Sequence, residues 1–216
     1  MNEVRAEWQR RVIAEYRSAA VTHHLILWYI QIGASPDLIR EGLRIVEQEL
    51  GHAELSLEVL AAAGGTPPAP VDRRTLALVT GEPLELAVVR GTVELFCLGE
   101  TVAVPLFRRM LRGTTEPVVR RALRKILADE AEHRRFGWDA LEWLLGGIPG
   151  AREVLQAELP AMLARVRASY GAGVETALSD DARTWGLLAP AEYGEELEWA
   201  TRRWYRPRFA ALGLTL

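Results

Sequence analysis

The sequence predicts an all-α fold in which four long helices form a bundle and shorter helices follow toward the C-terminus. Two observations lead to this prediction. Glycine and proline divide the chain into long segments without internal breakers. Along these segments apolar residues recur every three or four positions, as on one face of a helix, instead of alternating as in a strand. The four segments are residues 3–32, 36–63, 83–111 and 115–145.

Short turns pair these segments. The first pair is joined by Gly33-Ala34-Ser35-Pro36, where Ser35 is expected to cap the second helix and Pro36 to occupy its first position. Gly113 separates the second pair. The result is two antiparallel hairpins, joined by a longer crossover at residues 64–81. The third segment is apolar nearly all round, which predicts the most buried helix, kinked at Pro105.

The remaining residues, 151–216, predict one helix near 152–169 and another near 190–206. Their combined core is too small for an independent domain. We therefore expect a single domain spanning residues 1–216, with a core bundle over 3–145 and a C-terminal helical extension over 151–216.

Composition excludes several classes of protein. The net charge of −3 offers no general basic surface for nucleic acid or for an anionic membrane. A single cysteine, Cys97, excludes a disulfide framework and a cysteine-rich metal site. The first residues are too polar for a signal peptide, and no apolar run is long enough to span a membrane. We expect a soluble, cytoplasmic protein.

Each of the four apolar stripes contains a glutamate where an apolar residue is expected. These residues are Glu15, Glu49, Glu94 and Glu130. A buried carboxylate without a partner is costly, so it takes up a proton or binds a cation. Four carboxylates on one core therefore predict two divalent metal ions.

Two of these glutamates have a histidine three residues later: Glu49 is followed by His52, and Glu130 by His133. This spacing places both side chains on one face of a helix, one turn apart, so that they can bind the same ion. One Glu from each of two helices, with Glu-x-x-His from each of the other two, is the ligand set of carboxylate-bridged di-iron bundles.

The positions along the helices agree with a shared site. Glu15 and Glu49 lie 34 residues apart, and Glu94 and Glu130 lie 36 apart. Given the rise per residue of a helix, each hairpin places its two glutamates at a similar distance from its turn.

With these residues the sequence resembles the ferritin-like di-iron carboxylate superfamily, which includes the ribonucleotide reductase small subunit, bacterioferritin, rubrerythrin and the arylamine N-oxygenases. The resemblance covers about residues 3–145, and Asp129-Glu130-Ala131-Glu132-His133 is close to the family's Asp-Glu-x-x-His box. It implies bridging roles for Glu49 and Glu130. Asp129 would bond a ligand histidine such as His52. The full implied ligand set is Glu15, Glu49, His52, Glu94, Glu130 and His133.

Two alternatives stay open among the ligands. Glu100 also lies in the apolar third segment, and it is either an acid paired with arginine or a ligand or proton relay in place of, or beside, Glu94. His23 is either a hydrogen-bonded structural residue or a seventh ligand. Cys97 is expected to fill the core.

A carboxylate-rich set with two histidines favours two iron ions, with manganese or a mixed manganese–iron pair as alternatives. The resemblance implies activation of dioxygen or peroxide, and an oxidase or oxygenase with a small organic substrate and an external electron donor. A rubrerythrin needs more cysteines, and Ser56 stands where ribonucleotide reductase subunits carry their radical tyrosine. The alternatives are a ferroxidase or iron-handling protein and a non-catalytic bundle with a vestigial site. The aromatic C-terminal extension predicts either a cover over one end of the bundle or the surface of a homodimer.

Overall fold

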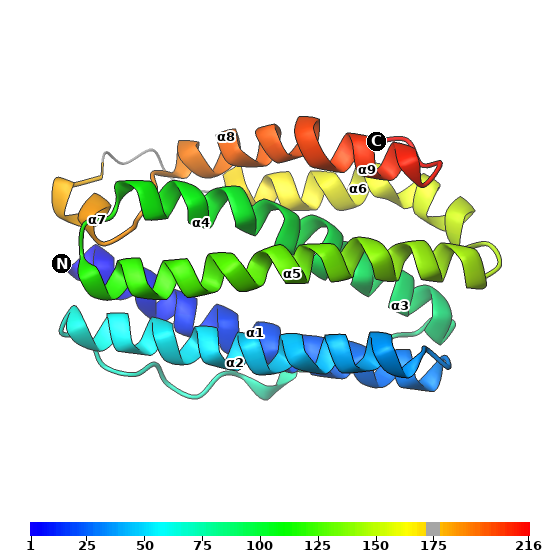
Figure 1. Cartoon of the computed structure of the whole chain (residues 1–216), viewed down its shortest axis with the longest axis horizontal. Coiled ribbons are helices and arrows are strands. Elements are labelled where there is room, and N and C mark those ends of the chain that lie inside the picture. Colours follow the sequence, from blue (N-terminus) through cyan, green and yellow to red (C-terminus); the bar gives the residue numbers. More distant parts are fainter. Residues whose placement is uncertain (172–177) are drawn as a thin grey trace. The chain divides into compact units, whose positions relative to one another are not determined.

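In the computed structural model the described residues, 1–171 and 178–216, are helical and contain no strand (Figure 1). The α-helices are α1 (Asn2–Gln31), α2 (Pro36–Ala62), α3 (Leu84–Thr92), α4 (Thr101–Gly113), α5 (Pro117–Gly147), α6 (Ala151–Gly171), α7 (Asp180–Thr184), α8 (Pro190–Ala200) and α9 (Arg206–Ala211). The described residues also form a 3-10 turn, η1 (Arg73–Thr75), and two π-helical segments, η2 (Val93–Glu100) and η3 (Thr201–Tyr205). The all-α prediction is therefore confirmed.

The helix boundaries agree with the turn residues of the sequence. The Ser35 hydroxyl accepts a hydrogen bond from the Leu38 N–H at 3.4 Å, which caps α2 as expected. Gly33 adopts a φ of 80°, a conformation that glycine reaches without a steric penalty, and it ends α1. The third segment differs from the prediction, because η2 separates α3 from α4, and Pro105 lies within α4.

The chain divides into two compact units, each built from separate stretches of sequence. The first unit comprises Met1–Gly81, Phe107–Asp129 and Leu178–Leu187. The second comprises Glu82–Leu106, Glu130–Ala177 and Leu188–Leu216. The boundary falls within α5, between Asp129 and Glu130.

In the first unit, α1 and α2 run side by side as a hairpin (Figure 1). Both helices bury large apolar side chains, which include Trp8, Leu25, Ile26, Tyr29, Ile45 and Leu60. The crossover after α2 is attached to α1 by the Leu78 N–H, which donates to His24 Nδ1 at 2.9 Å. Residues 178–187 also return to α1, where Trp8 Nε1 donates to the Trp185 carbonyl at 3.0 Å.

The second unit contains α3, η2, the first turns of α4, the later part of α5, and α6, α8, η3 and α9. Gly137 on α5 allows close approach to η2, since an added Cβ at this position would lie 2.4 Å from the Phe96 Cβ. In this unit α6 packs against α8, and Arg90 on α3 donates to both Glu158 carboxylate oxygens at 2.6 Å. The C-terminal segment contributes the fully buried Tyr205 and Phe209.

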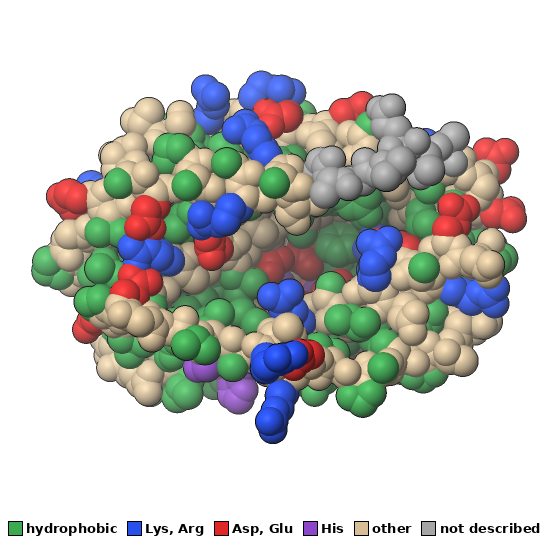
Figure 2. Space-filling model, turned by 180° about the vertical axis from the view of Figure 1, so that it is seen from behind, with side chains coloured by type: hydrophobic (Ala, Val, Ile, Leu, Met, Phe, Trp, Pro, Cys, Tyr) green, Lys and Arg blue, Asp and Glu red, His purple; other side chains and the backbone are tan. Residues whose placement is uncertain are grey.

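Charged side chains of both signs are intermixed on the face drawn in Figure 2, as the small net charge suggests. None of the described helices combines the length and the apolar character needed to cross a lipid bilayer.

Candidate metal centre

The first unit contains a buried set of two carboxylates and one imidazole. Glu15 comes from α1, and Glu49 and His52 come from successive turns of α2. Glu49 and His52 are each 1% exposed, and Glu15 is 9% exposed. His52 Nδ1 lies 3.9 Å from Glu15 Oε2 and 3.8 Å from Glu49 Oε2. The hairpin thus brings together three residues that the sequence predicted as ligands.

The other nitrogen of His52 is held by α5. His52 Nε2 lies 3.0 Å from Asp129 Oδ2, a hydrogen bond in which the ring donates when its proton is on Nε2. This is the contact that the resemblance implied for Asp129. With Nε2 directed at Asp129, the Nδ1 lone pair of that tautomer is directed toward Glu15 and Glu49, as a metal-binding imidazole requires.

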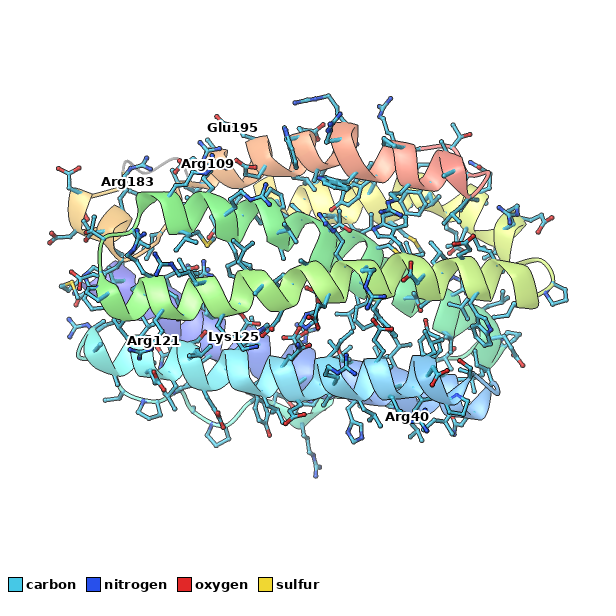
Figure 3. The ribbon with its side chains drawn as sticks, viewed as in Figure 1. Arg40, Arg109, Arg121, Lys125, Arg183 and Glu195 are labelled. Carbon is cyan, nitrogen blue, oxygen red and sulfur yellow. The ribbon has the colours of Figure 1, made fainter. Side chains whose placement is uncertain are left out.

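Asp129 is itself fixed by two further side chains. Lys125, labelled on α5 in Figure 3, donates to both Asp129 oxygens at 2.6 and 2.7 Å. Gln48 Nε2 donates to Oδ1 at 3.3 Å. Burial raises the pKa of Asp129, but the hydrogen bonds from Lys125 and His52 outweigh it and leave the pKa below its ordinary value. Asp129 is therefore an anion that orients His52. Its contacts with Gln48 and Lys125 were not predicted from the sequence, although the four-residue spacing of Lys125 and Asp129 is a recognisable helical pair.

The second unit contains a set of the same composition. Glu100 ends η2, and Glu130 and His133 lie one turn apart on α5. Their exposed fractions are 8%, 2% and 0%. His133 Nδ1 lies 3.6 Å from Glu130 Oε2, and one ligand atom of each of the three residues lies within 4.8 Å of the other two.

Each set gathers donor atoms of the kind that bind divalent ions. Distances of 3.6 to 3.9 Å between imidazole nitrogen and carboxylate oxygen are longer than hydrogen bonds. Two ligand atoms about 2.1 Å from one ion are separated by about 3.0 Å at an octahedral angle and about 3.4 Å at a tetrahedral one, so the side chains would draw slightly closer on binding. Each donor set is therefore a candidate site for one divalent ion.

Glu94, the third-segment ligand implied by the resemblance, is not buried. Its side chain is 49% exposed and forms an ion pair with Arg165 on α6. The physical reason is the π-helical η2, which contains both glutamates and changes the angle between successive side chains from that of an α-helix. The expectation of a buried Glu94 is wrong, and Glu100 is the residue that joins Glu130 and His133.

The remaining candidates are structural. His23 is exposed on α1, unlike the ligand residues, so we do not retain it as a seventh ligand. Cys97 is fully buried, its thiol donates to the Gly137 carbonyl at 3.3 Å, and burial raises its pKa well above the ordinary value. It is a core residue, as expected. Ser56 is fully buried near the Glu-x-x-His turn of α2.

No family model matches this chain, and no curated protein matches it.

Proposed function

We propose that this chain is a ferritin-like protein that binds two iron ions through carboxylates and oxidises a small organic substrate with dioxygen. The observation that supports the proposal is the repetition of one buried donor set. Each unit supplies two glutamates and one histidine to a point within its core, and each histidine follows one of its glutamates by three residues.

The two proposed ion sites both include contacts from helix α5. Asp129, which bonds His52 of the first set, and Glu130, which belongs to the second set, are consecutive residues of one helix, α5. Glu15, Glu49 and His52 in the first unit, and Glu100, Glu130 and His133 in the second, would hold the two ions.

The donor chemistry favours iron or manganese. Four carboxylates neutralise two divalent charges, and a set dominated by oxygen ligands with only two imidazoles suits these metals better than zinc or copper. When bound in its reduced state, such a pair supplies two electrons to dioxygen, and an external electron donor restores them. The side chains of this chain hold the ions, fix the His52 ring through Asp129 and keep bulk water from the ligand atoms.

The first test is metal content. Anaerobic loading with Fe²⁺ followed by desalting is expected to leave two ions per chain, and fewer than one would refute the proposal. His52→Ala and His133→Ala are each expected to lower the content. Glu54→Gln, which changes an exposed carboxylate on α2 two residues beyond His52, should leave it at two.

The second test separates oxidation of a substrate from iron storage. Addition of dioxygen to the ferrous protein should give oxygen uptake that continues only with an organic substrate and a reductant. Uptake proportional to added Fe²⁺, with growth of an iron mineral, would indicate a ferroxidase instead.

A further inference from the structure

The backbone changes its helical form beside Glu100. In η2 the hydrogen bonds of a π-helix span five residues instead of four. At its end the Thr101 N–H donates to the Leu98 carbonyl, three residues back, before α4 begins. Glu100 lies between these two residues, so the direction of its side chain depends on how this turn is held.

Three buried hydrogen bonds from other segments hold the turn. The Cys97 thiol donates to the Gly137 carbonyl, as described above. Trp138 Nε1 donates to Thr101 Oγ1 at 3.0 Å. The Tyr205 hydroxyl donates to the Leu98 carbonyl at 2.6 Å, the shortest of the three.

Tyr205 belongs to the C-terminal extension. It is the last residue of η3, it is 0% exposed, and burial raises its pKa well above the ordinary value, so the phenol remains a donor at neutral pH. The same extension supports a second of the three bonds, because Phe209 packs edge-to-face on Trp138 with ring centroids 4.8 Å apart.

We propose that Tyr205 is a positioning residue for Glu100: its hydrogen bond to Leu98 fixes the turn from which Glu100 reaches Glu130 and His133. This inference rests on the function proposed above. Ligand groups must be held to roughly 0.5 Å for tight binding, and supporting hydrogen bonds are what provide that precision. The C-terminal extension is thereby part of the metal centre, although none of its described residues belongs to either donor set.

The test uses Tyr205→Phe, which keeps the buried ring and removes only the hydroxyl. The matched control is Thr201→Val, which removes another buried hydrogen bond of η3, from Thr201 Oγ1 to the Leu197 carbonyl at 2.8 Å, without touching η2. Both full-length variants are titrated with Co²⁺ alone and followed by visible absorption. Hydrogen exchange of residues 93–101 is measured in the metal-free proteins.

In wild type and in Thr201→Val we expect two Co²⁺ ions with the same affinities. In Tyr205→Phe one ion should bind as in wild type, while the other binds about 10–100-fold more weakly with a changed absorption spectrum. Exchange of residues 93–101 should be faster in Tyr205→Phe only. Thermal stability should fall by a similar amount in both variants, because each loses one buried hydrogen bond. If Tyr205 had only a structural role, the two variants would also bind Co²⁺ alike.

Normal binding of both ions by Tyr205→Phe, or unchanged exchange of residues 93–101, would overturn the role of Tyr205 and leave the proposed function intact. Failure of the wild-type protein to bind Co²⁺ would overturn the proposed function, and this inference with it.

Discussion

Replacement of Glu100 by glutamine is expected to stabilise the metal-free protein and to weaken its stabilisation by metal. One oxygen of Glu100 lies within 4.8 Å of one of Glu130. At this distance, with an effective dielectric constant of about 20, two negative charges repel each other by about 3.5 kcal/mol. Interactions of these side chains with other groups offset part of that repulsion. We therefore expect Glu100→Gln to raise the free energy of unfolding of the metal-free protein by about 1–3 kcal/mol.

Metal should reduce the stability advantage of Glu100→Gln by about 2.3 kcal/mol and reverse it wherever that advantage is smaller. An ion present at 100 times its Kd stabilises the folded state by about 2.7 kcal/mol. If the loss of one ligand weakens that ion about 100-fold, the same concentration stabilises Glu100→Gln by only about 0.4 kcal/mol. The measurement is urea unfolding at pH 7, with and without Mn²⁺, for wild type and variant.

Glu94→Gln is the matched control. It removes a carboxylate of the same π-helical segment, but one that is exposed and paired with Arg165. Loss of this surface pair should cost less than about 1 kcal/mol and leave the Mn²⁺ effect unchanged. If Glu94→Gln abolishes the Mn²⁺ effect while Glu100→Gln retains it, the assignment of the ligand from η2 is wrong.

Three further changes test other parts of the structure. Asp129→Asn should weaken the ion bound by His52 about 10–100-fold in a Co²⁺ titration, because the ring loses the anion that orients it; unchanged affinity would contradict that role. Gly137→Ala should lower the free energy of unfolding by about 1–3 kcal/mol through overpacking. The control is Gly51→Ala, where the added Cβ would meet no neighbouring atom within 4 Å, and which should be neutral or stabilising. Equal effects of the two substitutions would argue against close packing at η2. The hydrogen bond from Arg90 holds the pKa of Glu158 below its ordinary value of 4.5. The ionised Glu158 therefore stabilises the fold by about a few tenths of a kcal/mol above pH 4.5, and this stabilisation is lost as the pH falls through the lowered pKa. Glu158→Gln should accordingly lose stability less steeply than wild type in acid-unfolding curves.

The sequence predicted most helix ends because local residues determine them. The Ser35 cap, the left-handed glycine at 33 and the glycines after α2 act within a few residues of the turn. Five of the six implied ligands are buried, and each was recognisable as a polar residue on an apolar stripe. Metal binding by them remains a prediction.

The third segment could not be predicted in the same way. An element that is apolar on all sides has no polar face, so its periodicity does not indicate which glutamate points inward. The π-helical form of residues 93–100 is held by partners 40 and 107 residues distant, Gly137 and Tyr205. Contacts of this kind cannot be inferred from local patterns. Whether residues 1–216 form a single domain also remains a prediction.

The first unit is assembled from three separate stretches of the chain, which has a consequence for biosynthesis. Its first stretch ends at Gly81, yet its last stretch ends at Leu187, about 100 residues later. At a translation rate of about 5–20 residues per second, the α1–α2 hairpin waits roughly 5–20 s on the ribosome for the segment that bonds Trp8. During that interval the surface around Trp8 lacks its cover, so we expect the nascent chain to expose apolar side chains longer than a unit built from one continuous stretch.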